Sequence, residues 1–182
     1  MQGRILFLCF VLGVVLAASA ESNRPPKTAS VRLMLSEVQA GATQAQQYCT
    51  LVFADRHFHY ERASLHHGKD LERKIYEGEF SESDWNALAG ILDNKDFRKL
   101  NVPRGVAPLI MQDSHVYTIS VARDTNFQNM EFLDNKSRKP YEPQLKPLLV
   151  WWKSFRGGHM AESKATPDVR CSLDSEHTVF SQ

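Results

Sequence analysis

The sequence lacks the short motifs that assign a chemistry to a protein. It contains no G-x-S-x-G nucleophile elbow, no H-E-x-x-H zinc motif, no G-x-G-x-x-G and no phosphate-binding P-loop. No cysteine stands in a signature of catalytic thiols. These absences disfavour the hydrolases, metalloproteases and nucleotide-binding enzymes that carry such motifs. We therefore expect no cofactor, and we favour a protein that is not an enzyme.

The chain also lacks an excess of charge of either sign. Its 22 lysine and arginine residues face 21 aspartate and glutamate residues, for a formal net charge of +1. A nearly neutral protein is weakly attracted to nucleic acid or to an anionic membrane surface. We expect a protein or small-molecule ligand as partner and no nucleic acid. The sequence identifies neither that ligand nor the oligomeric state.

Long apolar runs are absent except at the N-terminus. There, Ile5–Leu16 is an unbroken apolar stretch that follows Arg4 and precedes Ala18-Ser19-Ala20, an A-x-A cleavage site. This order of segments predicts a secretory signal peptide over residues 1–20. The alternative is a membrane anchor, but the run is shorter than the roughly 20 residues that a span needs. We expect a secreted or periplasmic protein with no stable membrane anchor after cleavage before Glu21.

Cysteine is scarce, with three residues in the whole chain. Cys9 leaves with the signal peptide, so Cys49 and Cys171 remain in a mature chain of 162 residues with 21 charges of each sign. Export to an oxidising compartment predicts a disulfide between them. The bond would hold the polar, irregular tail at 157–182 and contribute roughly 4–5 kcal/mol in the chain-entropy model. Two free thiols or an intermolecular pair are the alternatives.

The clearest local pattern is a strand and a helix between Lys74 and Leu100. Ile75–Phe80 alternates in the manner of a strand, and Ser81 then precedes an acidic first turn typical of a helix N-terminus. Apolar residues follow at i, i+3, i+4 and i+7, which places them on one buried helix face: Trp85, Leu88, Ala89 and Leu92.

A second amphipathic helix is predicted before Gly157-Gly158. Its apolar face has the same spacing: Leu145, Leu148, Leu149, Trp152 and Phe155. Pro147 should lie in or beside its first turn, because proline disrupts a helix interior. We expect the two apolar helix faces to meet on one sheet.

The remaining patterns predict strands. Cys49–Ala63 is expected to form a hairpin that turns at residues 54–57, and His115–Arg123 a second hairpin with Phe127–Leu133. Val31–Val38 alternates and favours a strand, with a short helix as the alternative. Ser64–Arg73 is polar and is expected to be a long exposed loop.

These elements predict an α+β fold. Its antiparallel sheet would be built from two hairpins plus one or two further strands, with two amphipathic helices packed on one face. The expected organisation is a lead-in at 21–48 with a possible first strand, an α+β domain at 49–156 and the tail at 157–182.

Histidines offer a candidate metal site. His57, His59 and Glu61 would share one face of a continuous strand, and His66 and His67 follow just downstream. Two imidazoles and a carboxylate can hold zinc. The alternative function is therefore a metal-binding protein or metal-dependent enzyme that uses His57, His59, His66 and His67. The other interpretation is a set of solvated histidines on a hairpin edge and loop.

Two further features bear on function. Phe58, Tyr60, Tyr76 and Trp151 are not all required by a single core face, so they offer a lead for a binding surface, although burial in the core is the commoner fate of aromatic residues. Asn135-Lys136-Ser137 fits the N-glycosylation acceptor pattern, which matters only in a eukaryotic source.

Two stretches carry a resemblance to known proteins. One is FADRHFHYER followed by YEGEF and a helix ending in ILDNKDFRKL; the other is HVYTISVAR and FQNMEF before LKPLLVWW. Together, over about residues 49–155, they resemble a family of small secreted bacterial proteins with no assigned activity. The first turn of that pattern usually reads Ala-Asp-Gly, and Arg56 stands at the glycine position here. The resemblance implies the fold and the compartment and brings no catalytic residues.

Taken together, these patterns favour an exported single-domain protein that acts by binding, as an envelope-associated accessory module without catalysis.

Overall fold

The computed structural model describes residues 30–69, 71–102 and 114–163 together with Cys171. The expected signal peptide at residues 1–20, its cleavage site, residues 21–29 of the lead-in and most of the tail lie outside the described residues. Within the described ranges, no helix is long and apolar enough to cross a membrane.

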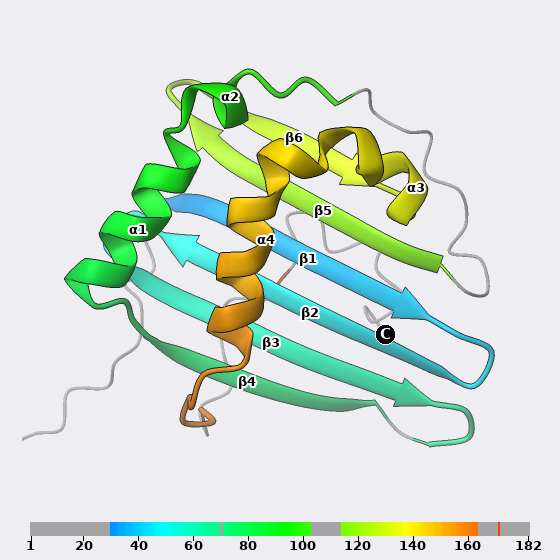
Figure 1. Ribbon diagram of the computed structural model, residues 1–182. Coiled ribbons are helices and arrows are strands. Elements are labelled where there is room, and N and C mark those ends of the chain that lie inside the picture. Colours follow the sequence, from blue (N-terminus) through cyan, green and yellow to red (C-terminus); the bar gives the residue numbers. More distant parts are fainter. Residues whose placement is uncertain (1–29, 70, 103–113, 164–170, 172–182) are drawn as a thin grey trace, which may run out of the picture.

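Six strands form one antiparallel sheet with the order β4-β3-β2-β1-β5-β6 (Figure 1). Their bounds are β1 Val31–Ala40, β2 Gln44–Phe53, β3 His57–His66, β4 Glu72–Glu79, β5 Ser114–Arg123 and β6 Asn126–Phe132. Every pair of neighbouring strands is antiparallel.

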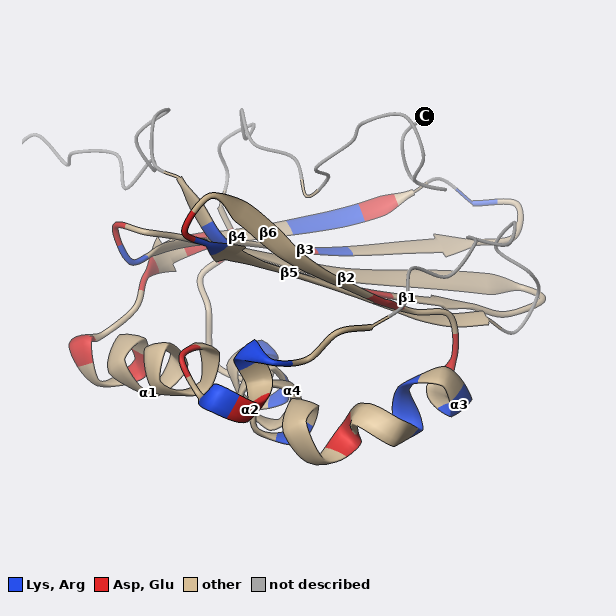
Figure 2. Cartoon of the chain, turned by 90° about the horizontal axis from the view of Figure 1, so that it is seen from above, with Lys and Arg blue, Asp and Glu red and all other residues tan. Residues whose placement is uncertain are grey.

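The helices are α1 Glu82–Leu92, α2 Lys95–Arg98, α3 Asn135–Arg138, the 3-10 turn η1 Lys139–Tyr141 and α4 Glu142–Arg156. All of them lie on one face of the sheet (Figure 2). The predicted α+β fold, with helices packed on one face of an antiparallel sheet, is confirmed.

The six strands are those of the two predicted hairpins together with two further predicted strands, Val31–Val38 and Ile75–Phe80. Val31–Ala40 is a strand, and it occupies the middle of the sheet because it pairs with both β2 and β5. The sheet therefore begins in the expected lead-in. The prediction of a long loop over Ser64–Arg73 was wrong, because β3 continues to His66 and β4 begins at Glu72. The ends of β2 and β3 carry exposed polar side chains, so they lack the apolar alternation by which strands are recognised.

The turn between β2 and β3 uses an uncommon backbone conformation. Arg56 has a φ of 75°, in the left-handed region that glycine adopts most readily. Asp55 Oδ1 accepts a hydrogen bond from the His57 amide at 3.2 Å, which closes the turn. The Arg56 guanidinium reaches Glu79 Oε1 on β4 at 2.7 Å.

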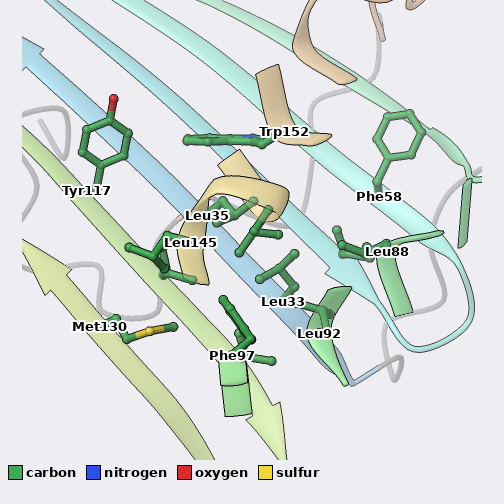
Figure 3. Close-up of a cluster of buried hydrophobic side chains, with 14 of the residues drawn as sticks. Leu33, Leu35, Phe58, Leu88, Leu92, Phe97, Tyr117, Met130, Leu145 and Trp152 are labelled. Carbon is green, nitrogen blue, oxygen red and sulfur yellow. The ribbon is translucent and has the colours of Figure 1, made fainter. Parts of the chain in front are cut away.

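The main core lies between the sheet and the helices (Figure 3). Ser81 caps α1 by accepting a hydrogen bond from the Asp84 amide, as its position predicts. Leu88 on α1 and Leu145 on α4 are both fully buried in this core. The predicted meeting of the two helix faces on one sheet is thus confirmed.

Helix α4 contains a proline in its interior. The helix begins at Glu142, so Pro147 lies in the second turn rather than in or beside the first, and that prediction was wrong. Pro143 in the first turn supports the earlier start, because proline is favoured there. Pro147 leaves the carbonyl of Pro143 without its helical donor, and both residues are exposed, so water can take the place of that donor.

A smaller apolar cluster lies on the other face of the sheet. It contains Met34, Leu51, Phe53, Cys49 and Cys171. Cys49 and Cys171 form the predicted disulfide, with their Cα atoms 5.9 Å apart. Cys171 packs in this cluster, on the face of the sheet away from the helices. The bond therefore anchors this residue to the face that the helices leave uncovered.

Candidate functional site

The structure separates the four histidines of the predicted metal site. His57 begins β3 and His66 ends it, so nine residues of extended chain, roughly 30 Å, lie between them. His66 and His67 are exposed, whereas His57 lies beside the turn, with Nδ1 3.3 Å from Asp55 Oδ2. His59 alone is completely buried.

His59 lies between two carboxylates on the face away from the helices. Its Nε2 is 2.8 Å from Glu61 Oε1, and its Nδ1 is 3.2 Å from Glu77 Oε1 on the neighbouring strand. An imidazole donates from both nitrogens only when it is protonated. The pair His59 and Glu61 shares a face, as the spacing of two residues predicts, and Glu77 joins it across the register of β3 and β4.

Glu61 is the most enclosed carboxylate on this face. Burial raises its pKa, but the hydrogen bond and the charge of His59, the backbone amide of Cys171 and the charge of Arg73 together hold the pKa below its ordinary value. Arg73 Nη1 is 3.0 Å from Glu61 Oε2, and the Cys171 amide donates to Glu61 Oε1 at 3.0 Å.

One group of metal-ligating side chains forms among the described residues. Ligand atoms of His59, Glu61 and Cys171 all lie within 4.8 Å of one another, and all three residues are buried. The sulfur of Cys171 is bonded to Cys49 in this structure. Sequence spacing identified His59 and Glu61 but missed Cys171, because the sheet register and the disulfide bring that residue from 110 positions away.

A second polar network lies on the helix face, around Glu37. This carboxylate is 3% exposed. Its Oε1 lies 2.6 Å from His115 Nε2 and accepts from Tyr117 Oη and from Gln39 Nε2, both at 2.8 Å, while Arg156 Nη1 contacts Oε2. Burial raises the pKa of Glu37, but these hydrogen bonds and the charge of Arg156 lower it to about 2.

The Glu37 network uses its groups internally. Both carboxylate oxygens have partners, and the Arg156 guanidinium also lies 4.5 Å from the ring centroid of Tyr48 and 4.2 Å from that of Trp152. This arrangement fixes the end of α4 to β1 and β5. The sequence does hold a signal for it: Glu37 follows Leu33 and Leu35 at a spacing of two, so a charge falls on the apolar face of β1.

The candidate glycosylation residue lies beside this network. Asn135 is the first residue of α3 and is exposed, and its side-chain nitrogen is 3.4 Å from His115 Nδ1.

An open cleft lies between the end of β4 and the end of α4. Its volume is about 510 Å³. We call it the aromatic cleft, and its lining includes four aromatic residues and three carboxylates: Phe58, Phe80, Trp151, Phe155, Glu77, Glu79 and Asp84. No lysine or arginine is found among the described residues that line it. Phe58 and Trp151, which the sequence marked as a lead for a binding surface, both lie here.

The rings of the cleft pack against one another. Trp151 and Phe155 are stacked, with centroids 5.5 Å apart, and Phe58 meets Phe155 edge-on at 5.0 Å. Gly78 allows Phe58 to lie flat over β4, because a Cβ atom at this position would be 2.9 Å from Phe58 Cζ. The wall of the cleft is therefore preformed by packing within the protein.

The three acidic residues that line the cleft differ in whether a basic side chain lies beside their carboxylate. Glu79 pairs with Arg56, and Glu77 faces His59. Asp84 accepts a hydrogen bond from Ser81 Oγ at 2.7 Å and forms no ion pair within the described ranges. The cleft thus combines aromatic walls with one carboxylate, that of Asp84, which forms no ion pair among the described residues.

The fold defines an α+β protein with a six-stranded antiparallel sheet and helices on one face. Comparison with models of known protein families and with curated proteins finds no match. Function is therefore argued from the geometry of these sites.

Proposed function

We propose that the protein acts outside the cytoplasm as a non-catalytic binding protein, and that its aromatic cleft takes a small organic cation with an apolar body. The observation that carries this proposal is the lining of the cleft, which combines aromatic rings with the carboxylate of Asp84 and contains no lysine or arginine among the described residues.

Two forces favour such a ligand. The face of an aromatic ring attracts a cation, most strongly where water is partly excluded. The Asp84 carboxylate at the rim adds a longer-range attraction that also disfavours anions. The cleft volume of about 510 Å³ falls within the range common for small-molecule sites. Apolar contact with Trp151 and Phe155 would supply most of the affinity, and Asp84 the charge preference.

Export is supported by two independent features. The apolar run Ile5–Leu16 with its A-x-A site is typical of a signal peptide. The disulfide between Cys49 and Cys171 is typical of proteins that leave the reducing cytoplasm.

A binding role rather than catalysis is supported by the two polar networks. Around Glu37 and around His59, carboxylates and imidazoles hydrogen-bond to one another inside the protein. General acid–base catalysis requires such a group to reach a substrate proton. The aromatic cleft, by contrast, is open and contains no imidazole–carboxylate hydrogen bond directed into it among the described residues.

Calorimetric titration with three probes of matched shape tests the proposal. The probes are benzyltrimethylammonium, neutral benzyl alcohol and anionic phenylmethanesulfonate. We expect the cation to bind at least about tenfold more tightly than the alcohol, and the anion not to bind. Trp151→Ala should abolish binding, and Asp84→Asn should reduce the preference for the cation.

The matched control is Val150→Ala. Val150 neighbours Trp151 on α4, but its side chain is 55% exposed and does not line the cleft. This variant should bind the cation as the unaltered protein does. Equal affinity for the three probes would overturn the charge assignment, and a dissociation constant above about 10 mM for all three would overturn the site.

A further inference from the structure

We infer that the protein holds a divalent metal ion such as zinc when its disulfide is reduced, through His59, Glu61, Cys171 and Cys49. This site lies on the face of the sheet opposite the helices, and the inference does not rest on the function proposed for the aromatic cleft.

Three of the four ligand atoms already lie close together. Those of His59, Glu61 and Cys171 lie within 4.8 Å of one another. Cys49 Sγ lies outside that group but is bonded to Cys171 Sγ, so a small side-chain movement after reduction would bring it to the metal. Two thiolates, one imidazole and one carboxylate form a four-ligand set that suits tetrahedral zinc.

The groups behind the ligands have the arrangement that metal sites require. A histidine that binds a metal through one nitrogen usually donates from the other to a carboxylate, which fixes its ring. His59 Nε2 faces Glu61, whereas Nδ1 is 3.2 Å from Glu77 Oε1. Arg73 Nη1 holds the other oxygen of Glu61 at 3.0 Å.

The surroundings favour retention of a metal ion. All four ligand residues are buried, and Met34, Leu51 and Phe53 pack around the two cysteines. A dry, apolar environment strengthens the bonds between a cation and thiolates.

Metal binding requires that the disulfide is first reduced by an external dithiol. A dithiol supplies two electrons and two protons, the Sγ–Sγ bond of Cys49 and Cys171 breaks, and the dithiol becomes a disulfide. Zinc then bonds to two thiolates, to His59 Nε2 and to a Glu61 oxygen. The two thiol protons and the proton on Nε2 pass to solvent. The same two sulfurs therefore serve either the disulfide or the metal, which makes the site sensitive to the redox state.

Zinc titration of the full exported chain, without a histidine tag, tests the inference. One sample is oxidised, and the other is reduced with dithiothreitol and desalted without oxygen. We expect the reduced protein to bind one zinc per chain with a dissociation constant below about 1 µM in competition with a chromophoric chelator. The oxidised protein should bind at least about 100-fold more weakly.

Variants separate these ligands from adventitious sites. His59→Ala should weaken binding by at least about tenfold, and Glu77→Gln, which alters only the orienting partner, by about 10- to 100-fold. Cobalt in place of zinc should show a near-ultraviolet thiolate charge-transfer band that Cys171→Ser diminishes. His66→Ala, an exposed histidine on the same strand, is the matched control and should bind as the unaltered protein does.

Circular dichroism, recorded alongside, makes every outcome decisive. If reduction unfolds the chain, restoration of the fold by zinc supports the inference, and failure to restore it overturns the inference. A folded, reduced protein that binds no zinc also overturns it, as does equal binding by the oxidised and reduced forms or by Cys171→Ser.

Discussion

The Glu37 network makes a quantitative prediction about acid stability. The folded-state pKa of Glu37 is about 2, whereas its ordinary value is 4.5. Because the pKa is lowered by folding, the stabilisation is fully present above the unfolded value and is lost as the pH falls through the folded value. The gap between the two values corresponds to about 3 kcal/mol. The window of loss therefore runs from about pH 4.5 down to about pH 2.

The perturbation is Glu37→Gln, which keeps the shape of the side chain and removes its charge. At pH 7 the variant should be less stable than the unaltered protein by about 2–4 kcal/mol, because Arg156 and His115 lose a buried carboxylate partner. That difference should shrink by about 0.8 kcal/mol at pH 4 and by about 2 kcal/mol at pH 3, because Glu37 of the unaltered protein takes up a proton in the unfolded state at these pH values while it stays ionised in the folded state.

Urea unfolding followed by tryptophan fluorescence, at pH 7, 5, 4 and 3 with the disulfide intact, measures the difference. The difference between the unfolding free energies of the unaltered protein and the variant is compared at each pH. Other carboxylates, including Glu61, contribute the same pH dependence to both proteins, so their contribution cancels. A companion variant, Arg156→Met, removes the positive charge beside Glu37. The pH range over which the stabilisation by Glu37 is lost should therefore move to higher pH. A difference between Glu37→Gln and the unaltered protein that stays constant from pH 7 to pH 3 would refute the assignment of a lowered pKa.

Three substitutions test the packing. Gly78→Ala places a Cβ atom 2.9 Å from the Phe58 ring and should destabilise the protein by about 1–3 kcal/mol in the same unfolding assay; an unchanged stability would mean that the ring moves freely. Leu88→Ala empties a fully buried position and should cost about 2–5 kcal/mol, and a loss below about 0.5 kcal/mol would contradict its place in the core. Pro147→Ala restores a donor to the Pro143 carbonyl and should raise the stability by about 1 kcal/mol or more; a loss of stability would show that the proline is required.

Local patterns were sufficient to predict the main elements of the fold. Ser81 and the apolar spacing behind it located α1, because capping and amphipathicity act within a few residues. The alternation of residues between the two strand faces likewise predicted the second hairpin. Cys49 and Cys171 were paired by elimination, which required no geometry.

Long-range pairing explains what those patterns missed. The central position of β1 depends on two partner strands, one of which begins 74 residues after β1 ends. The polar ends of β2 and β3 are held by backbone hydrogen bonds, and these leave no mark on the side-chain sequence. For the same reason the sequence clusters histidines that the extended strand holds far apart. Glu37 and Arg156 do meet, although they are 119 residues apart in the sequence.

The aromatic cleft follows from the way in which the chain leaves α4. The helix ends at Arg156 and is capped by Gly157, and the chain then returns to the outer edge of β4, where the Ser163 amide donates to Ile75 O at 2.7 Å. This contact shields the middle of an edge strand from pairing with other chains. It does not extend to Gly78 and Glu79, and the cleft opens at that end of β4. The absence of a side chain on Gly78 lets Phe58 form its floor, so the same residue that would weaken a strand elsewhere shapes the site here.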